Sequence, residues 1–440
     1  MQTPHGPFAG RTIDDLGRDL RAGRTTAEGL VRDALDAISR IDPVLNAFVS
    51  ADAEGALAAA READRELAGG TDRGPLHGLP VGVKDMVMVA GQPATMGSRH
   101  FNGYVPDTDA VCVARLREAG AVLIGKTTTH EFAYGPTGDQ SAAGPSRNPY
   151  DPERMSGGSS GGSGAAVAAG LVPLAIGTDT GGSVRIPAAL CGVAGFKPAY
   201  GAIPADGVFP LSPSLDHVGV LARTAEECFL SYGLLSGRDV PESEAAPRVA
   251  WLEPTDLYAC DPEVLRVAAE AAGTTEKVVF PPGVADAFRA VYATIGMTEA
   301  ADVHADRVAE APELFGAEVL DRLRNSMEVP AWKYRRAVAE REWLAEAAKE
   351  LFAGHDVLAL PTVPLTAPPL FQREAVLDGR QIGVRAALLA FTCPWNVVGF
   401  PALSVPAGSV GGLPVGLQLV CRPGDEHLLA AAAARVAGRA

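Results

Sequence analysis

Two Gly-Gly-Ser turns lie in the first half of this 440-residue chain, and each joins segments that are predicted to be regular structure. The first turn, at 157–163, leads into a helix of small residues. The second, at 177–187, follows a predicted strand at 172–177. Glycine adopts backbone angles that other residues avoid, so successive N–H groups can converge on one point. Because strands and helices flank both turns, the pattern indicates two rigid loops and not a flexible linker.

Strands and helices alternate along the chain without sequence repeats, which predicts an α/β fold. We expect one domain, 1–440, built on a large mixed, mostly parallel sheet with helices on both faces. Helices are predicted in 12–40, ending at Asp42-Pro43. Region 240–355 is helical and acidic, and it either covers the substrate or forms outer-layer helices. Other strands are predicted at 81–84, 122–126, 249–252, 278–280, 357–360, 402–405 and 415–420, with helices at 53–67, 109–119 and 426–439.

The composition excludes several classes of protein. The formal net charge is −15 and the basic residues are scattered, which argues against nucleic acid or an anionic membrane as a partner. No apolar run reaches the length of a spanning helix, and residues 1–11 lack the apolar core of a secretory signal. Six cysteines without C-x-x-C pairing indicate buried thiols in a reducing compartment. We therefore expect a cytoplasmic protein that needs no metal or other cofactor.

Lys84 ends an apolar run at 79–83, where a buried strand is predicted. Burial disfavours the charged form of a lysine and lowers its pKa, so the neutral amine can accept a proton from a serine. An ion pair with Asp85 is the structural alternative. The N–H groups of the second turn, at Thr180, Gly181, Gly182 and Ser183, are candidates for an oxyanion hole.

Glycine-rich turns have two other common uses in enzymes. A phosphate-binding loop requires a lysine at its end, and no lysine lies between Lys126 and Lys197, which excludes it. Residues 158–162 match Gly-x-Ser-x-Gly, the nucleophile elbow, with Ser160 as nucleophile. An elbow follows a strand, whereas residues 148–154 are predicted to be a loop.

The chain resembles the amidase signature family over nearly its full length, most strongly over 74–224, the signature core, and over 356–427. Segment 240–355 resembles it weakly and is the variable part. The segments that carry the resemblance are 74–85, 125–133, 157–163, 177–187, 191–198, 214–224, 360–362, 396–402 and 412–418.

The resemblance implies a role for particular residues. Lys84 corresponds to the catalytic lysine, Ser159 to a bridging serine that follows a cis peptide bond, and Ser183 to the nucleophile. In such an enzyme the proton of Ser183 passes through Ser159 to neutral Lys84, and an acyl-enzyme forms and is hydrolysed. Asp179 and Arg185 correspond to residues that support the loop.

The substrate is predicted less sharply. Ile186 stands where the glutaminase subunits of tRNA-dependent amidotransferases have glutamine, which favours an apolar acyl side. Tyr134, Phe391 and Trp395 are candidates for lining the site, although ordinary core positions would explain them equally well. We expect hydrolysis of small or aromatic amides, anilides, carbamates or esters, as in an aryl acylamidase or urethanase. The alternatives are a non-enzymatic binding protein and a glutaminase subunit; a homodimer is compatible with the sequence, but no residue indicates one.

Overall fold

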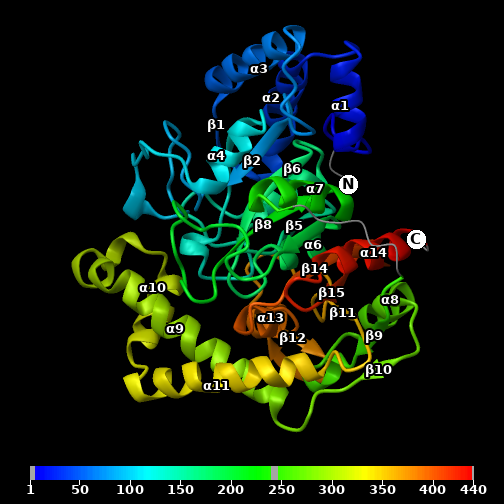
Figure 1. The fold of residues 1–440 in the computed structure, drawn as a ribbon. Helices are drawn as coiled ribbons and strands as arrows, with labels where there is room; N and C mark the ends of the chain where they lie inside the picture. The colour runs from blue at the N-terminus through cyan, green and yellow to red at the C-terminus, as the bar shows by residue number, and fades with distance from the viewer. Residues whose placement is uncertain (1–4, 239–245, 439–440) are drawn as a thin grey trace.

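The computed structural model describes residues 5–238 and 246–438, and one large mixed sheet runs through it with helices packed on both faces (Figure 1). The predicted α/β architecture is confirmed. Parallel pairing is confined to the blocks β3-β2-β6 and β11-β9-β10, and the strands between them pair antiparallel. The order across the sheet is β1 (Phe48–Ala51), β3 (Val122–Thr127), β2 (Pro80–Lys84), β6 (Leu174–Asp179), β8 (His217–Ala222), β7 (Ala194–Lys197), β14 (Ala402–Val410), β15 (Leu413–Val420), β11 (Val357–Pro361), β9 (Val249–Leu252) and β10 (Lys277–Val278).

Both glycine-rich turns connect strands of this sheet to helices, as predicted. The first turn leads into α5 (Gly161–Ala168), and the second connects β6 to α6 (Arg185–Cys191). The residues that form β2 and β6 are all buried, as expected for strands covered on both faces. The parallel pairing of these two neighbours brings the end of β2, with Lys84, beside the end of β6.

The remaining helices surround the sheet. Three long ones, α9, α10 and α11, pack together at one end of the molecule, where the ribbon is yellow-green to yellow in Figure 1. Two small hairpins lie outside the sheet, β4-β5 (Arg147–Asn148 and Asp151–Met155) and β12-β13 (Glu374–Leu377 and Arg380–Gly383). The other helices are α1 (Ile13–Arg21), α2 (Ala27–Leu45), α3 (Ala53–Ala68), α4 (Val111–Glu118), α7 (Ala225–Ser236), α8 (Pro262–Ala272), α9 (Val284–Glu310), α10 (Ala317–Met327), α11 (Ala331–Glu350), α12 (Val384–Ala390), α13 (Cys393–Val397) and α14 (Glu426–Ala437).

The predicted end of the second helix is wrong. Helix α2 continues through Pro43 to Leu45 and ends at Asn46, which adopts the left-handed conformation. The carboxylate of Asp42 accepts hydrogen bonds from the N–H groups of Ala47 and Phe48 at 2.6 and 3.1 Å, so it fixes the chain just beyond the helix. A proline in the last turn costs less than one in the interior, because few intrahelical bonds remain to be lost there.

All six cysteines are buried and none forms a disulfide, as predicted. Within the described ranges, no helix is both long enough and apolar enough to cross a membrane. Those residues also contain no group of three or more His, Cys, Asp and Glu side chains that could hold a metal ion.

Candidate active site

Lys84 lies fully buried at the end of β2, with two hydroxyl groups around its amine. Its Nζ donates hydrogen bonds to Ser159 Oγ and to Thr178 Oγ1, both at 2.7 Å. The alternative that Lys84 pairs with Asp85 is not supported, because Asp85 Oδ1 lies 3.6 Å from Nζ of a different lysine, Lys126. Sequence reasoning missed Thr178, which precedes the second turn and bears no motif glycine.

Burial lowers the pKa of Lys84 from 10.5 to about 7, although the negative charges of Asp179 and Asp216 partly oppose this shift. A substantial fraction of the amine is therefore unprotonated near neutral pH. A neutral amine beside a serine hydroxyl can accept its proton, which a charged ammonium group cannot do.

The two glycine-rich turns lie against each other. The backbone N–H of Ser160 donates to the carbonyl of Ser183 at 3.1 Å, which places the residue after Ser159 beside the second turn. The peptide bond between Gly158 and Ser159 is cis, as the resemblance implied. Ser160 itself is fully buried, and its hydroxyl is bonded to the backbone of Thr178, donating to the carbonyl and accepting from the N–H at 3.2 Å each. Ser160 therefore does not serve as the nucleophile of an elbow.

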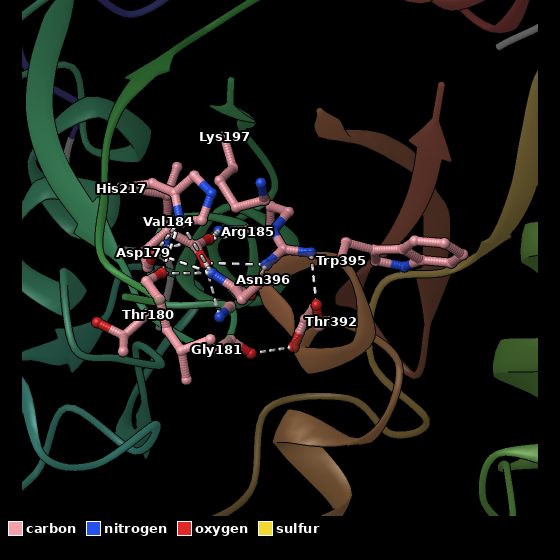
Figure 2. Close-up of polar contacts among 12 residues, drawn as sticks. Asp179, Thr180, Gly181, Val184, Arg185, Lys197, His217, Thr392, Trp395 and Asn396 are labelled. Atoms are coloured by element: carbon pink, nitrogen blue, oxygen red, sulfur yellow. Dashed lines mark hydrogen bonds and ion pairs between the residues drawn. The ribbon is translucent and has the colours of Figure 1, made fainter. Parts of the chain in front are cut away.

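An Asp179–Arg185 ion pair holds the second turn in shape (Figure 2). Both side chains are fully buried, and two guanidinium nitrogens of Arg185 donate to the carboxylate at 2.8 and 3.0 Å. The carboxylate also accepts from the N–H groups of Gly182 and Val184. Burial alone would raise the pKa of Asp179, but the charge and hydrogen bonds of Arg185 hold it well below its usual range. The predicted supporting role of this pair is confirmed.

Arg185 also ties the turn to distant motifs. Its remaining N–H groups donate to Asn396 Oδ1 at 2.6 Å, to Gln418 Oε1 at 2.7 Å and to the carbonyl of Thr392 at 2.9 Å. Thr392 in turn donates its hydroxyl to the carbonyl of Gly181 at 2.6 Å. These bonds explain why motifs near 396 and 418 accompany the second turn in the sequence.

The predicted oxyanion hole needs one correction. The N–H of Gly182 already donates to Asp179 at 2.8 Å, so it is not available to a substrate. In the described part of the chain, the N–H groups of Gly181 and Ser183 donate to no protein acceptor. These two groups are the free donors of the predicted set, and Ser183 itself is 5% exposed.

A cavity of about 240 Å³ opens beside Ser183. Three of the predicted site residues besides Ser183 line it: Tyr134, Thr180 and Gly181. The cavity is lined by Ala133, Tyr134, Gly135, Pro136, Thr180, Gly181, Ser183, Leu211, Arg289, Tyr292, Ala293, Gly296, Met297, Arg385, Ala386, Leu389, Ala390 and Cys393. Residues of α9, within the 240–355 region, therefore form part of its wall.

Tyr292 on α9 is a site residue that sequence reasoning missed. A Cβ atom at Gly181 would collide with its hydroxyl, so the phenol lies directly against the second turn. Burial raises the pKa of Tyr292, which keeps the hydroxyl protonated and able to donate. No signal in the sequence distinguishes this tyrosine, because it lies in the weakly resembling segment.

Three predicted substrate-binding residues do not line the cavity. Phe391 and Trp395 are fully buried, and the Trp395 indole N–H donates to the carbonyl of Phe391 at 3.1 Å, one helical turn away. Figure 2 shows the indole pointing away from the Asp179 network. Ile186 is also fully buried and packs behind Gly182, so it says nothing about the polarity of the space in front of Ser183.

Comparison with known proteins identifies the family. Residues 29–430 match the family model described as Amidase. The chain belongs to the amidase signature family. It is 35% identical to AtzE of Pseudomonas sp. (strain ADP), one of the subunits of 1-carboxybiuret hydrolase, over 93% of this chain and 94% of that protein. It is equally 35% identical to a glutamyl-tRNA(Gln) amidotransferase subunit from Roseiflexus sp. (strain RS-1), over 95% and 94%.

Solved structures agree with this assignment. A crystal structure of an amidase superposes with a TM-score of 0.92 at 38% identity and covers 97% of this chain and 99% of its own. The native peptide amidase of Stenotrophomonas maltophilia superposes with a TM-score of 0.81 at 30% identity, covering 98% and 97%. The protein is thus an amidase-family hydrolase that acts on C–N bonds.

Proposed function

We propose that this amidase hydrolyses small amides through a relay of Ser183, Ser159 and Lys84. The Ser183 oxygen attacks the carbonyl carbon, and its proton passes through Ser159 to the neutral amine of Lys84. The C–N bond then breaks as the same relay returns the proton to the leaving nitrogen. Water attacks the resulting ester, gives its proton to Lys84, and releases the acid while Ser183 regains its hydrogen.

The contact between Lys84 and Ser159 carries this proposal, because a buried amine with a pKa of about 7 lies 2.7 Å from a serine hydroxyl. The N–H groups of Gly181 and Ser183 can donate to the oxyanion that forms in the attack, and each such donor is typically worth about 3 kcal/mol in the transition state. The Tyr292 hydroxyl, packed on Gly181, lies at the same end of the cavity.

The size of the cavity supports a small substrate. Its volume of about 240 Å³ is below the roughly 300 Å³ at which sites for drug-sized ligands begin. Helix α9 supplies one wall, which supports the hypothesis that the 240–355 region covers the substrate. Small aliphatic amides, compact anilides and carbamates remain the substrate classes that we propose.

A substrate panel tests this function against its main alternative. The purified protein is offered a simple aliphatic amide, a compact anilide, an aryl carbamate and free glutamine, and the released amine, alcohol or ammonia is measured. We expect turnover of the amide, anilide or carbamate by the isolated chain. Turnover of glutamine alone would instead favour the glutaminase alternative, for which the amidotransferase relatives are the precedent.

The rate of hydrolysis is expected to depend on pH through Lys84. Below its pKa of about 7 the amine is protonated and cannot accept the proton of Ser159. The value of kcat/KM should therefore fall about tenfold per pH unit on the acid side and level off above neutrality. Initial rates from about pH 5.5 to about pH 8.5 measure this profile. A flat profile over this range would exclude Lys84 as the base.

A further inference from the structure

Arg385, in the first turn of α12, places a guanidinium group in the wall of the cavity. Ala386, Leu389 and Ala390 of the same helix line the cavity with it. Its Nε is buried and has no hydrogen-bond partner. Among the described residues, none accepts a hydrogen bond from this side chain or forms an ion pair with it. A buried donor of this kind is unfavourable unless a ligand supplies the acceptor.

The other arginines around the cavity are all paired. Arg289 also lines the cavity, while Arg322 and Arg373 lie close enough to lower the pKa of the neighbouring His130. Each of these three has a carboxylate partner. The partners are Asp286 for Arg289, Glu318 for Arg322, and both Asp139 and Glu318 for Arg373. Arg385 is thus the unmatched positive charge at the site.

The charge of the cavity wall differs from that of the whole chain. Its lining residues include two arginines and no aspartate or glutamate, although the chain has a formal net charge of −15. A wall of this kind favours an anionic ligand over a neutral one. Burial of an uncompensated charge is costly, and a bound anion would remove that cost.

The guanidinium of Arg385 is also held in place. Its Cζ lies 5.9 Å from the centre of the Tyr134 ring, within the range of a cation–π contact. The hydroxyl of Tyr134 is hydrogen-bonded to Ser326 Oγ at 2.8 Å, which fixes the ring. A positioned guanidinium can donate two parallel hydrogen bonds to a carboxylate.

The course of α12 sets the distance from the reacting centre. The helix runs from Arg385 to Ala390, about 8 Å along its axis. Shortly after it, Thr392 donates to the carbonyl of Gly181 in the second turn. Helical side chains lean towards the N-terminus, so Arg385 points away from that turn. An anionic group bound there would be separated from the scissile bond by a few atoms.

We propose that the substrate carries a carboxylate a few bonds from the scissile C–N bond and that Arg385 binds this carboxylate. The inference rests on the proposed function, and it replaces the apolar acyl site expected from Ile186. The carboxylate belongs either to the acyl part, as in a half-amide of a short dicarboxylic acid, or to the leaving amine, as in an N-acyl amino acid. Arg385 then determines specificity without touching the reacting atoms.

Binding to the Ser183→Ala protein tests the proposal without depending on turnover. Isothermal titration calorimetry compares succinamate with butanamide, glutaramate with pentanamide, and N-acetylglycine with N-ethylacetamide. In each pair a methyl group replaces the carboxylate. We expect the carboxylate of at least one pair to bind about 100-fold more tightly than its neutral counterpart. The pair that shows this preference identifies which side of the scissile bond carries the charge.

Variants of Arg385 then assign the preference. Arg385→Met in the same background should abolish it, and Arg385→Lys, which keeps the charge but not the paired donors, should retain part of it. Arg380→Met, at an exposed position in β13, is the matched control and should leave the preference unchanged. Equal affinities within all three pairs, or a preference that survives Arg385→Met, would overturn the proposal.

Turnover by the native protein separates this proposal from the proposed function. A carboxylate preference in binding, with no hydrolysis of any of the six compounds, would support the Arg385 site and argue against hydrolysis of small amides. Hydrolysis of the neutral and charged members at equal kcat/KM would leave the hydrolase intact and refute the Arg385 site.

Discussion

Replacing Ser183 with alanine is expected to lower kcat for amide hydrolysis by about 10⁴-fold or more, because no acyl-enzyme can form without its hydroxyl. Lys84→Met should cause a loss of similar size, since the proton of Ser183 then has no base to accept it. The two losses should not add in the double variant, because both residues act in one relay. Steady-state rates on whichever amide the native protein hydrolyses best measure all three variants.

Ser163→Ala is the matched control for these variants. Ser163 is another glycine-flanked serine of the first turn, but it lies outside the cavity lining, and its hydroxyl contacts Thr127 Oγ1 at 2.7 Å and the carbonyl of Ile176 at 3.1 Å. We expect its kcat to stay within a few-fold of the native value. If the Ser183→Ala protein kept full activity, the assignment of Ser183 as nucleophile would be wrong.

The sequence predicts the fold and the two turns well because local rules govern both. Buried strands appear as short apolar runs, and the turns need glycine wherever a side chain would collide. Gly182, for example, has a φ of 136°, and a Cβ there would strike Thr392. A lysine at the end of an apolar run is likewise visible in the sequence, which is how Lys84 was found.

The walls of the cavity could not be predicted in the same way. Tyr292 and Arg385 face the cavity only because α9 and α12 pack around it, and this packing depends on contacts far apart in the chain. Neither residue belongs to a glycine motif. Phe391 and Trp395 mislead for the opposite reason, since they adjoin motif residues yet turn into the core. Nearness to a motif in sequence thus indicates position in the fold but not the direction of a side chain.

The ion pair of Asp179 and Arg185 leads to the largest expected effect on stability. Arg185→Met removes the guanidinium and leaves a fully buried carboxylate without its counter-charge. Breaking a buried pair in this way typically costs about 3–5 kcal/mol in the free energy of unfolding. Urea denaturation followed by tryptophan fluorescence measures the loss. Arg380→Met, at an exposed position, should change this free energy by less than about 0.5 kcal/mol.

The pH dependence of this loss distinguishes a charge effect from a packing effect. In the native protein Arg185 holds the pKa of Asp179 below its unfolded value, so the pair stabilises the fold above that value and the contribution is lost as pH falls. Without Arg185, burial raises the pKa of Asp179 instead, and the carboxylate destabilises the fold increasingly as pH rises. The deficit of Arg185→Met should therefore be larger at neutral pH than near about pH 4. Adding Asp179→Asn should recover part of the loss at neutral pH, whereas a deficit independent of pH and unchanged in the double variant would mean that Arg185 acts through packing alone.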